Sequence, residues 1–146
     1  MTFEFIVAAI VFFSLILYIM VFLNSTLSEY REEFYVNDLQ SRVMKISDLL
    51  LHNKDVGISG GYPVINTALV DSLQQTCDNN YPSLLRALDI TDHRIRIQIN
   101  KSRSGDIILD CPSVISIPGS ATKVGVTRFG VLNTTNEMVI INLLMW

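Results

Sequence analysis

The stretch FIVAAIVFFSLILYIMVFL, residues 5–23, decides the fold of this chain. Only Ser14 and Tyr18 interrupt its apolar run, and no charged residue occurs between Glu4 and Glu29. A helix of this length spans roughly 28 Å, close to the hydrocarbon thickness of a bilayer. Its β-branched residues would suit a strand in water, but a lone segment in lipid must satisfy its backbone polar groups internally. We therefore predict a transmembrane helix.

The rest of the 146 residues has the composition of an ordinary small globular head. A chain of this length is ordinarily one domain, which argues against a multidomain enzyme. With 14 acidic and 11 basic side chains the net charge is −3, which excludes a nucleic-acid binder driven by net basic charge. An apolar content of 49% excludes a disordered chain, and the apolar segment excludes a freely soluble monomer.

A cleaved secretory signal peptide is the competing interpretation of the apolar segment. It would require a basic region before the apolar run and a small-residue cleavage site after it. The sequence instead begins Met-Thr-Phe-Glu, and Leu23-Asn24-Ser25 is a poor cleavage site. Because no Lys or Arg precedes the run, we expect that a short basic leader has been removed or lies upstream of the numbering.

The helical pattern continues beyond the apolar segment, through residues 24–53. Apolar side chains recur at helical spacing while charges fill the other faces, and no Pro or Gly occurs before Gly57. We predict one continuous helix from about Thr2 to about His52, roughly 75 Å long. Residues 1–23 are apolar all round, whereas residues 24–53 carry a single apolar stripe. The stripe comprises Leu27, Tyr30, Phe34, Leu39, Val43, Ile46 and Leu50.

Residues 54–93 read as a loop region with two short helices. Gly and Pro break residues 54–63, which we predict as a loop. Asn66 is a predicted N-cap for a helix over residues 67–75, and Pro82 opens a second helix that ends near Leu88.

From Arg94 to Trp146 the hydrophobic period changes to two, which predicts strands. Two hairpins, with turns at residues 101–105 and 133–136, indicate a four-stranded antiparallel sheet. The last strand is almost uniformly apolar, so it should be central or covered on both faces. The predicted class is α+β, a long N-terminal helix packed on this sheet.

Two cysteines, Cys77 and Cys111, suggest two alternatives. In an exported head they would form one disulfide, which would stabilise the fold by about 3–4 kcal/mol. The other interpretation is a pair of unpaired buried thiols.

Three Asn-x-Ser/Thr triplets are possible glycosylation sites. They begin at Asn24, Asn100 and Asn133, and the last two fall in the predicted hairpin turns. A glycan can be accommodated in such turns, although triplets this short also arise by chance.

No constellation typical of catalysis or of metal binding is present. The two histidines lack further ligands at metal spacing, and His52 suits the last turn of the long helix, where a cation complements the dipole. Four basic residues surround one hairpin, and we interpret them as a solvated face or a weak site for acidic surfaces. They are Arg94, Arg96, Lys101 and Arg103. We predict no enzyme, no metal, no cofactor and no nucleic-acid partner.

Glu4 is an acid at the start of an otherwise uncharged apolar helix. It could simply complement the helix dipole at a membrane surface, which is worth about 0.3–1 kcal/mol. Alternatively, it becomes buried in an assembly and pairs there with a cation, for which a neighbouring chain's α-amino group is suited.

Residues 2–10, TFEFIVAAI, resemble the start of a mature type IV pilin, in which an acidic residue lies near the processed terminus. The order of a long helix, a variable loop region and an antiparallel sheet with one disulfide is also similar to that family. Residues 126–146 resemble the terminal hairpin of archaeal type IV pilin-like proteins. The acid here stands fourth rather than fifth, so we expect the mature first residue one position upstream of Met1.

The resemblance implies processing by a prepilin peptidase, storage in the membrane, and extraction into an extracellular filament at the cell surface. Its partners would be identical or related pilin subunits and the assembly machinery, with residues 5–23 packed in the core. The assembly residues would be Glu4, Phe5, Ser14 and Tyr18, the last two hydrogen-bonding between subunits. The alternative is a single-pass membrane-anchored surface binding protein with an exported β-rich head, part of a cell-surface machine.

Overall fold

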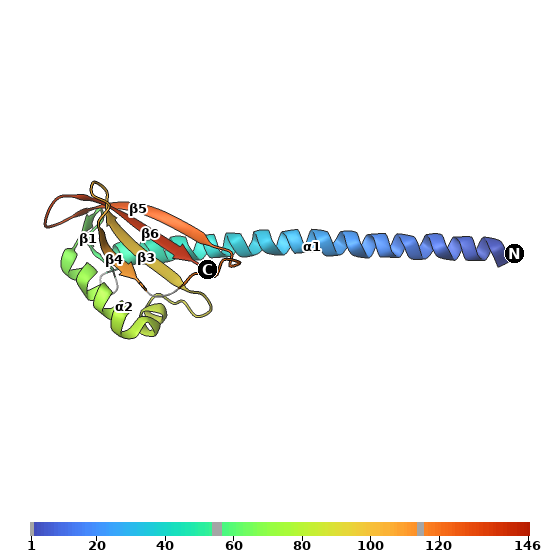
Figure 1. The fold of residues 1–146 in the computed structure, drawn as a ribbon, viewed down its shortest axis with the longest axis horizontal. Coiled ribbons are helices and arrows are strands. Elements are labelled where there is room, and N and C mark those ends of the chain that lie inside the picture. Colours follow the sequence, from blue (N-terminus) through green and yellow to red (C-terminus); the bar gives the residue numbers. More distant parts are fainter. Residues whose placement is uncertain (1, 54–56, 114–115) are drawn as a thin grey trace. The chain divides into compact units, whose positions relative to one another are not determined.

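The computed structural model describes residues 2–53, 57–113 and 116–146. The fold is α+β, as predicted, and Figure 1 shows its helices and strands coloured along the sequence. They are α1 (Thr2–His52), β1 (Ser59–Gly61), β2 (Val64–Ile65), α2 (Thr67–Ala87), β3 (Ile95–Lys101), β4 (Ile107–Cys111), β5 (Val124–Leu132) and β6 (Met138–Met145). The chain divides into two compact units, Met1–Asn37 and Asp38–Trp146. We call them the N-terminal unit and the head, and describe each by itself.

Helix α1 is continuous over Thr2–His52, which confirms the predicted span. Its ends suit the helix dipole, with Glu4 in the first turn and His52 in the last. After the helix, the backbone N–H of Gly57 donates to the carbonyl of Asn53 at 3.0 Å. A Cβ at Gly57 would collide with that same carbonyl oxygen, so the close approach that ends the helix requires glycine.

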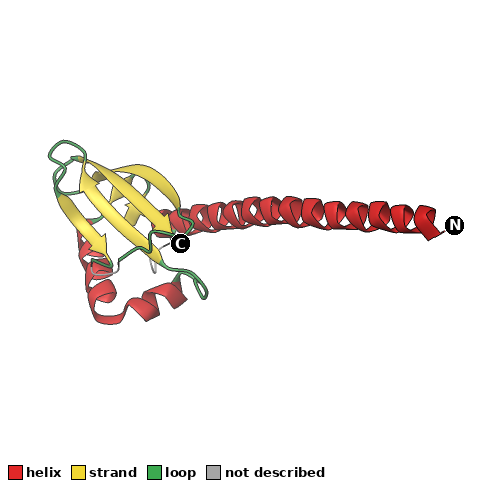
Figure 2. Cartoon of the chain, turned by 45° about the vertical axis from the view of Figure 1, so that its right-hand side comes forward, coloured by secondary structure: helices red, strands yellow, loops and turns green. Residues whose placement is uncertain are grey.

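The head contains a sheet of six strands in the order β1-β2-β5-β6-β3-β4. Figure 1 labels β5, β6, β3 and β4 of this sheet, and Figure 2 shows the strands in yellow. The prediction of four antiparallel strands is therefore wrong. Strands β1 and β2 lie in and just after the segment predicted as a loop, and β2 pairs with β5 in parallel through Ile65 and Leu132. Strands of three and two residues are too short to produce a recognisable alternation, which is why the sequence pattern missed them.

Strand β6 is central, between β5 and β3, as its apolar sequence predicted. Val139, Ile141, Leu143 and Met145 are buried, and the residues between them are half-buried on the opposite face. The buried face is the one that the helices cover.

Residues 38–52 of α1 and the whole of α2 contribute to one core with that face of the sheet. The largest fully buried side chains include Leu39 and Leu50 of α1, Leu84 of α2, and Ile95, Ile97, Ile99, Ile141 and Leu143 of the strands. The head thus has two layers, helices on one side of a single sheet.

Helix α2 combines the two predicted short helices into one element with a break. Asn80 has non-helical dihedrals (φ −154°, ψ 61°), and Pro82 follows it, as expected where a second helical segment begins. At the start of α2, the Oδ1 of Asn66 accepts from the backbone N–H of Ala68 at 3.0 Å, which confirms the predicted N-cap.

Candidate assembly surface

The apolar segment of the N-terminal unit is exposed along its whole length. None of the apolar stretch is buried within the structure, and Phe5 is 75% exposed. By length and composition α1 is able to cross a membrane, and a signal sequence would pass the same test. So large an apolar surface requires a non-aqueous environment, either lipid or other protein.

Glu4 and Phe5 lie in the first turns of α1, both exposed. Across the described residues, no ion pair involves Glu4. Glu4 belongs to the first turn of the helix, where a negative charge is favourable because the N–H groups there lack partners within the helix. It is therefore available to a cation from outside the chain.

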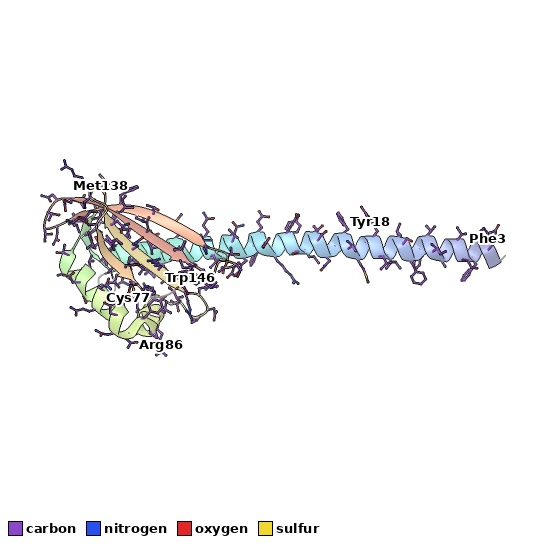
Figure 3. The ribbon with its side chains drawn as sticks, in the orientation of Figure 1. Phe3, Tyr18, Cys77, Arg86, Met138 and Trp146 are labelled. Atoms are coloured by element: carbon purple, nitrogen blue, oxygen red, sulfur yellow. A yellow bond between two sulfur atoms is a disulfide. The ribbon has the colours of Figure 1, made fainter. Side chains whose placement is uncertain are left out.

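Ser14 and Tyr18 lie one helical turn apart on α1, as their spacing requires. The Ser14 hydroxyl donates to the carbonyl of Ile10 at 2.8 Å, so its lone pairs remain open to a second donor. Tyr18 is 71% exposed, and its ring stacks beside Phe22 with centroids 6.4 Å apart. Figure 3 shows the Tyr18 side chain directed away from the helix.

The apolar stripe continues past the apolar segment, still within the N-terminal unit. Leu27, Tyr30 and Phe34 are exposed, Phe34 to 78%. Three carboxylates and a single base accompany them, namely Glu29, Glu32, Glu33 and Arg31.

All of the net charge belongs to the N-terminal unit. It holds 4 acids, including Glu4, and 1 base, which gives −3, and the head holds the remaining 10 acids and 10 bases. The head is therefore neutral as a whole, whereas the N-terminal unit combines exposed apolar surface with uncompensated negative charge.

The four basic residues of the hairpin do not form one cluster. Arg96 makes a bidentate pair with Asp110, with N–O distances of 2.8 and 2.7 Å. This hydrogen bonding raises the pKa of the Arg96 guanidinium.

The other three basic residues are also dispersed. Lys101 lies 2.9 Å from Glu137, and hydrogen bonding between the two raises the pKa of Lys101 and lowers that of Glu137. Arg94 and Arg103 stand before and after β3, at opposite ends of the strand. Two of the four charges are thus compensated internally, which weakens the interpretation of this hairpin as a site for acidic surfaces.

The disulfide between Cys77 and Cys111 is present, which confirms the paired alternative over unpaired thiols. It joins α2 to β4 across 34 positions with a Cα–Cα distance of 5.8 Å, and both residues are buried. Beside it, Gln74 of α2 accepts from the backbone N–H of Asp110, so that α2 also covers part of the edge strand β4.

Two further contacts fix the head and were missed from the sequence. The Tyr81 hydroxyl donates to the Ile95 carbonyl at 2.7 Å and accepts from the Ile95 N–H at 3.1 Å, and burial raises the pKa of the phenol. Arg128 faces the helices from β5, and its Nε donates to the hydroxyl of Ser47 at 2.9 Å. A charge at an inward position of an alternating strand was the signal that could have identified Arg128.

The three glycosylation triplets lie in different environments. Asn24 lies within α1, one residue past the apolar segment. Asn100 lies in β3 rather than in the predicted turn, because the ladder with β6 extends as far as Lys101. Asn133 lies in the turn after β5, as predicted.

Within residues 2–53, 57–113 and 116–146, no group of three or more His, Cys, Asp or Glu side chains could hold a metal ion. His52 ends α1, with its Nδ1 3.1 Å from the Asp48 carbonyl and its ring beside that of Tyr62. A hollow between α1 and the segment that joins α2 to β3 combines Asp38 and Asp89 with Arg42 and Lys45, so it presents charges of both signs.

Comparison of the chain with protein-family models, with curated proteins and with solved structures gives no match.

Proposed function

We propose that this chain is the structural subunit of a type IV pilus-like extracellular filament, assembled through the apolar half of α1. The observation that carries the proposal is the position of Glu4, an acid directly before the uncharged, exposed residues 5–23 of a helix that continues unbroken to His52. A simple membrane anchor needs the apolar residues but has no need of the acid.

The apolar segment has two successive environments in this proposal. Before assembly it spans the membrane, and after assembly it is packed among identical helices. Each step keeps its side chains out of water, at about 25 cal/mol per Å² of apolar surface. The subunit can therefore leave the bilayer without exposing residues 5–23.

Glu4 gives the packed state its register. A carboxylate moved into an apolar filament core is costly unless a cation meets it, and the α-amino group of the neighbouring subunit is the available cation. Only a subunit at the correct position along the filament axis brings the Glu4 carboxylate and the α-amino group together. The charge pair therefore favours ordered addition of subunits over random association.

Ser14 and Tyr18 supply a second directional contact. The Tyr18 hydroxyl donates to the open lone pairs of Ser14 on another copy, while the Ser14 hydroxyl continues to donate to Ile10. Phe5 packs beside Glu4 and excludes water from the charge pair.

Export of the head agrees with its disulfide. The bond between Cys77 and Cys111 is a buried disulfide, and disulfides persist in oxidising compartments outside the cytosol. The prepilin peptidase, the membrane and the assembly machinery are the partners that the proposal requires.

The composition of sheared surface filaments tests the proposal. The chain is expected in the sheared fraction of wild-type cells, and these filaments should disappear when its gene is deleted and return on complementation. Filaments that persist unchanged after deletion, with the chain retained in the membrane fraction, would rule out a structural role.

The second candidate is a single-pass surface binding protein anchored by the same helix. It is favoured by the open face of the sheet, where Phe129 and Met138 are exposed beside a hollow lined by Gln98, Thr127 and Asn142. Replacing Glu4 by Ala separates the candidates, because assembly depends on the acid and anchoring does not.

A further inference from the structure

The side chain of Asn133 is held in one orientation by the start of α2. Its Oδ1 accepts from the backbone N–H of Thr67 at 3.2 Å and lies 3.3 Å from the Thr67 hydroxyl. A backbone N–H can only donate, so the amide atom that faces Thr67 must be the oxygen. The amide nitrogen, Nδ2, is consequently on the side away from α2.

This nitrogen is free to react. Asn133 is exposed in the turn between β5 and β6, and no hydrogen bond from its Nδ2 occurs among the described residues. The triplet Asn133-Thr134-Thr135 is an acceptor sequence for N-linked sugar. The nitrogen that would carry the sugar is the one that the fold leaves unused.

Attachment of a sugar also preserves the contact with α2. A glycosylated asparagine remains an amide, so Oδ1 keeps both of its hydrogen bonds to Thr67. The modified side chain therefore anchors the helix start as the unmodified one does.

The other two triplets do not offer this geometry. Asn24 is in helical conformation next to the apolar segment, close to the lipid that we propose surrounds this segment before assembly. Asn100 is paired with both neighbouring strands, and its Oδ1 is buried without a hydrogen-bond partner. Neither amide is displayed on a turn.

We infer that Asn133 is an N-glycosylation site, the one among the three triplets that is used. The donor is a sugar linked through phosphate to a lipid carrier. The amide nitrogen forms a bond to C1 of the sugar, the bond from C1 to the phosphate oxygen breaks, the phosphate leaves with the electron pair, and a base takes one amide proton. The inference rests on export of the head, which the proposed function shares, and does not depend on filament formation.

Peptide mass spectrometry of the full chain isolated from its own cells tests the site with three variants. Asn133→Gln removes the acceptor and alters the contact with Thr67. Thr135→Val removes the triplet and leaves the contact between Asn133 and Thr67 in place, although it also removes the exposed hydrogen bonds of the Thr135 hydroxyl with Glu137. Thr135→Ser retains both the triplet and a hydroxyl. Asn100→Gln is the matched control at an unused triplet.

We expect a sugar mass on the wild-type peptide that contains Asn133, retained in Thr135→Ser and Asn100→Gln and absent in Asn133→Gln and Thr135→Val. Stripped of sugar, Thr135→Val should still unfold in a cooperative thermal transition, with only the small decrease in Tm expected for losing the exposed hydrogen bonds to Glu137, which shows that loss of the modification is not loss of the fold. An unmodified Asn133 in the wild-type protein, or sugar only on Asn24 or Asn100, would overturn the inference.

The two proposals fail separately. Filaments built from chains with unmodified Asn133 would overturn the glycosylation site and leave the pilin proposal intact. Sugar on Asn133 of a chain that never enters filaments would do the reverse.

Discussion

The two units of this molecule differ in where their apolar side chains lie and in how their charges are balanced. The head buries its apolar residues in its own core, balances 10 acids with 10 bases and closes with a disulfide. The N-terminal unit exposes almost every apolar residue and carries the entire net charge of −3. The head buries its apolar residues through contacts within itself, whereas the apolar surface of the N-terminal unit must be covered by lipid or by other protein. For that reason we assign assembly to the N-terminal unit.

The largest effect is expected from Glu4→Ala, which changes the N-terminal unit and leaves the head intact. Loss of one partner from a buried charge pair costs about 3–5 kcal/mol per subunit contact. Filaments should therefore be lost from the sheared fraction while the chain accumulates in the membrane, as measured by immunoblot of both fractions.

Glu29→Ala is the matched control for this variant, because Glu29 lies beyond the apolar segment and we assign it no charge pair in the filament core. Normal filaments in Glu4→Ala would contradict the role of the acid and favour the anchor.

The converse variant, Cys77→Ala with Cys111→Ala, should damage the head alone. Removing the cross-link across 34 positions is expected to lower the free energy of unfolding by about 3–4 kcal/mol, since the unfolded chain gains entropy. Urea denaturation in detergent, with and without reductant, measures the loss. Membrane insertion of α1 should not change, and a variant that no longer enters the membrane would contradict the separation of the two units.

A smaller effect is expected from Arg128→Met within the head. Ser47 is 0% exposed, and its hydroxyl would lose the guanidinium that hydrogen-bonds to it, which costs about 1–3 kcal/mol. Arg103→Met, an exposed position, serves as the control. Equal midpoints of thermal unfolding in the two variants would show that the contact between Arg128 and Ser47 contributes nothing to the head.

The smallest effect concerns Lys101 and Glu137, whose paired side chains are only partly buried. Lys101 holds the folded pKa of Glu137 below its ordinary 4.5, so the pair stabilises the head above that pH. The contribution falls as the pH drops through the folded pKa, because the carboxyl then takes up its proton in both states. Chemical denaturation between about pH 3 and pH 7 should show a weaker pH dependence for Glu137→Gln than for the wild type. Identical pH profiles would contradict the shift.

Local signals explain which parts of the fold could be predicted. The absence of Gly and Pro before Gly57 set the length of α1, the side chain of Asn66 marked the start of α2, and the apolar run of β6 placed it at the centre of the sheet. Each of these features depends on residues close together in the sequence.

Long-range pairing explains what the sequence could not indicate. Strand β2 exists because it pairs with β5, where Ile65 packs so closely on Gly130 that a Cβ there would meet its side chain. The extension of β3 through Asn100 depends likewise on β6. For the assembly surface, the sequence indicated which residues are apolar, whereas the open lone pairs of Ser14 came from the structure.

A cryo-electron microscopy map of the sheared filament tests the central claim most directly. The account predicts that residues 5–23 pack around the filament axis, with the Glu4 carboxylate beside the α-amino group of a neighbouring subunit and the heads outside. A filament whose core is built from another chain, or one in which Glu4 faces solvent, would contradict it.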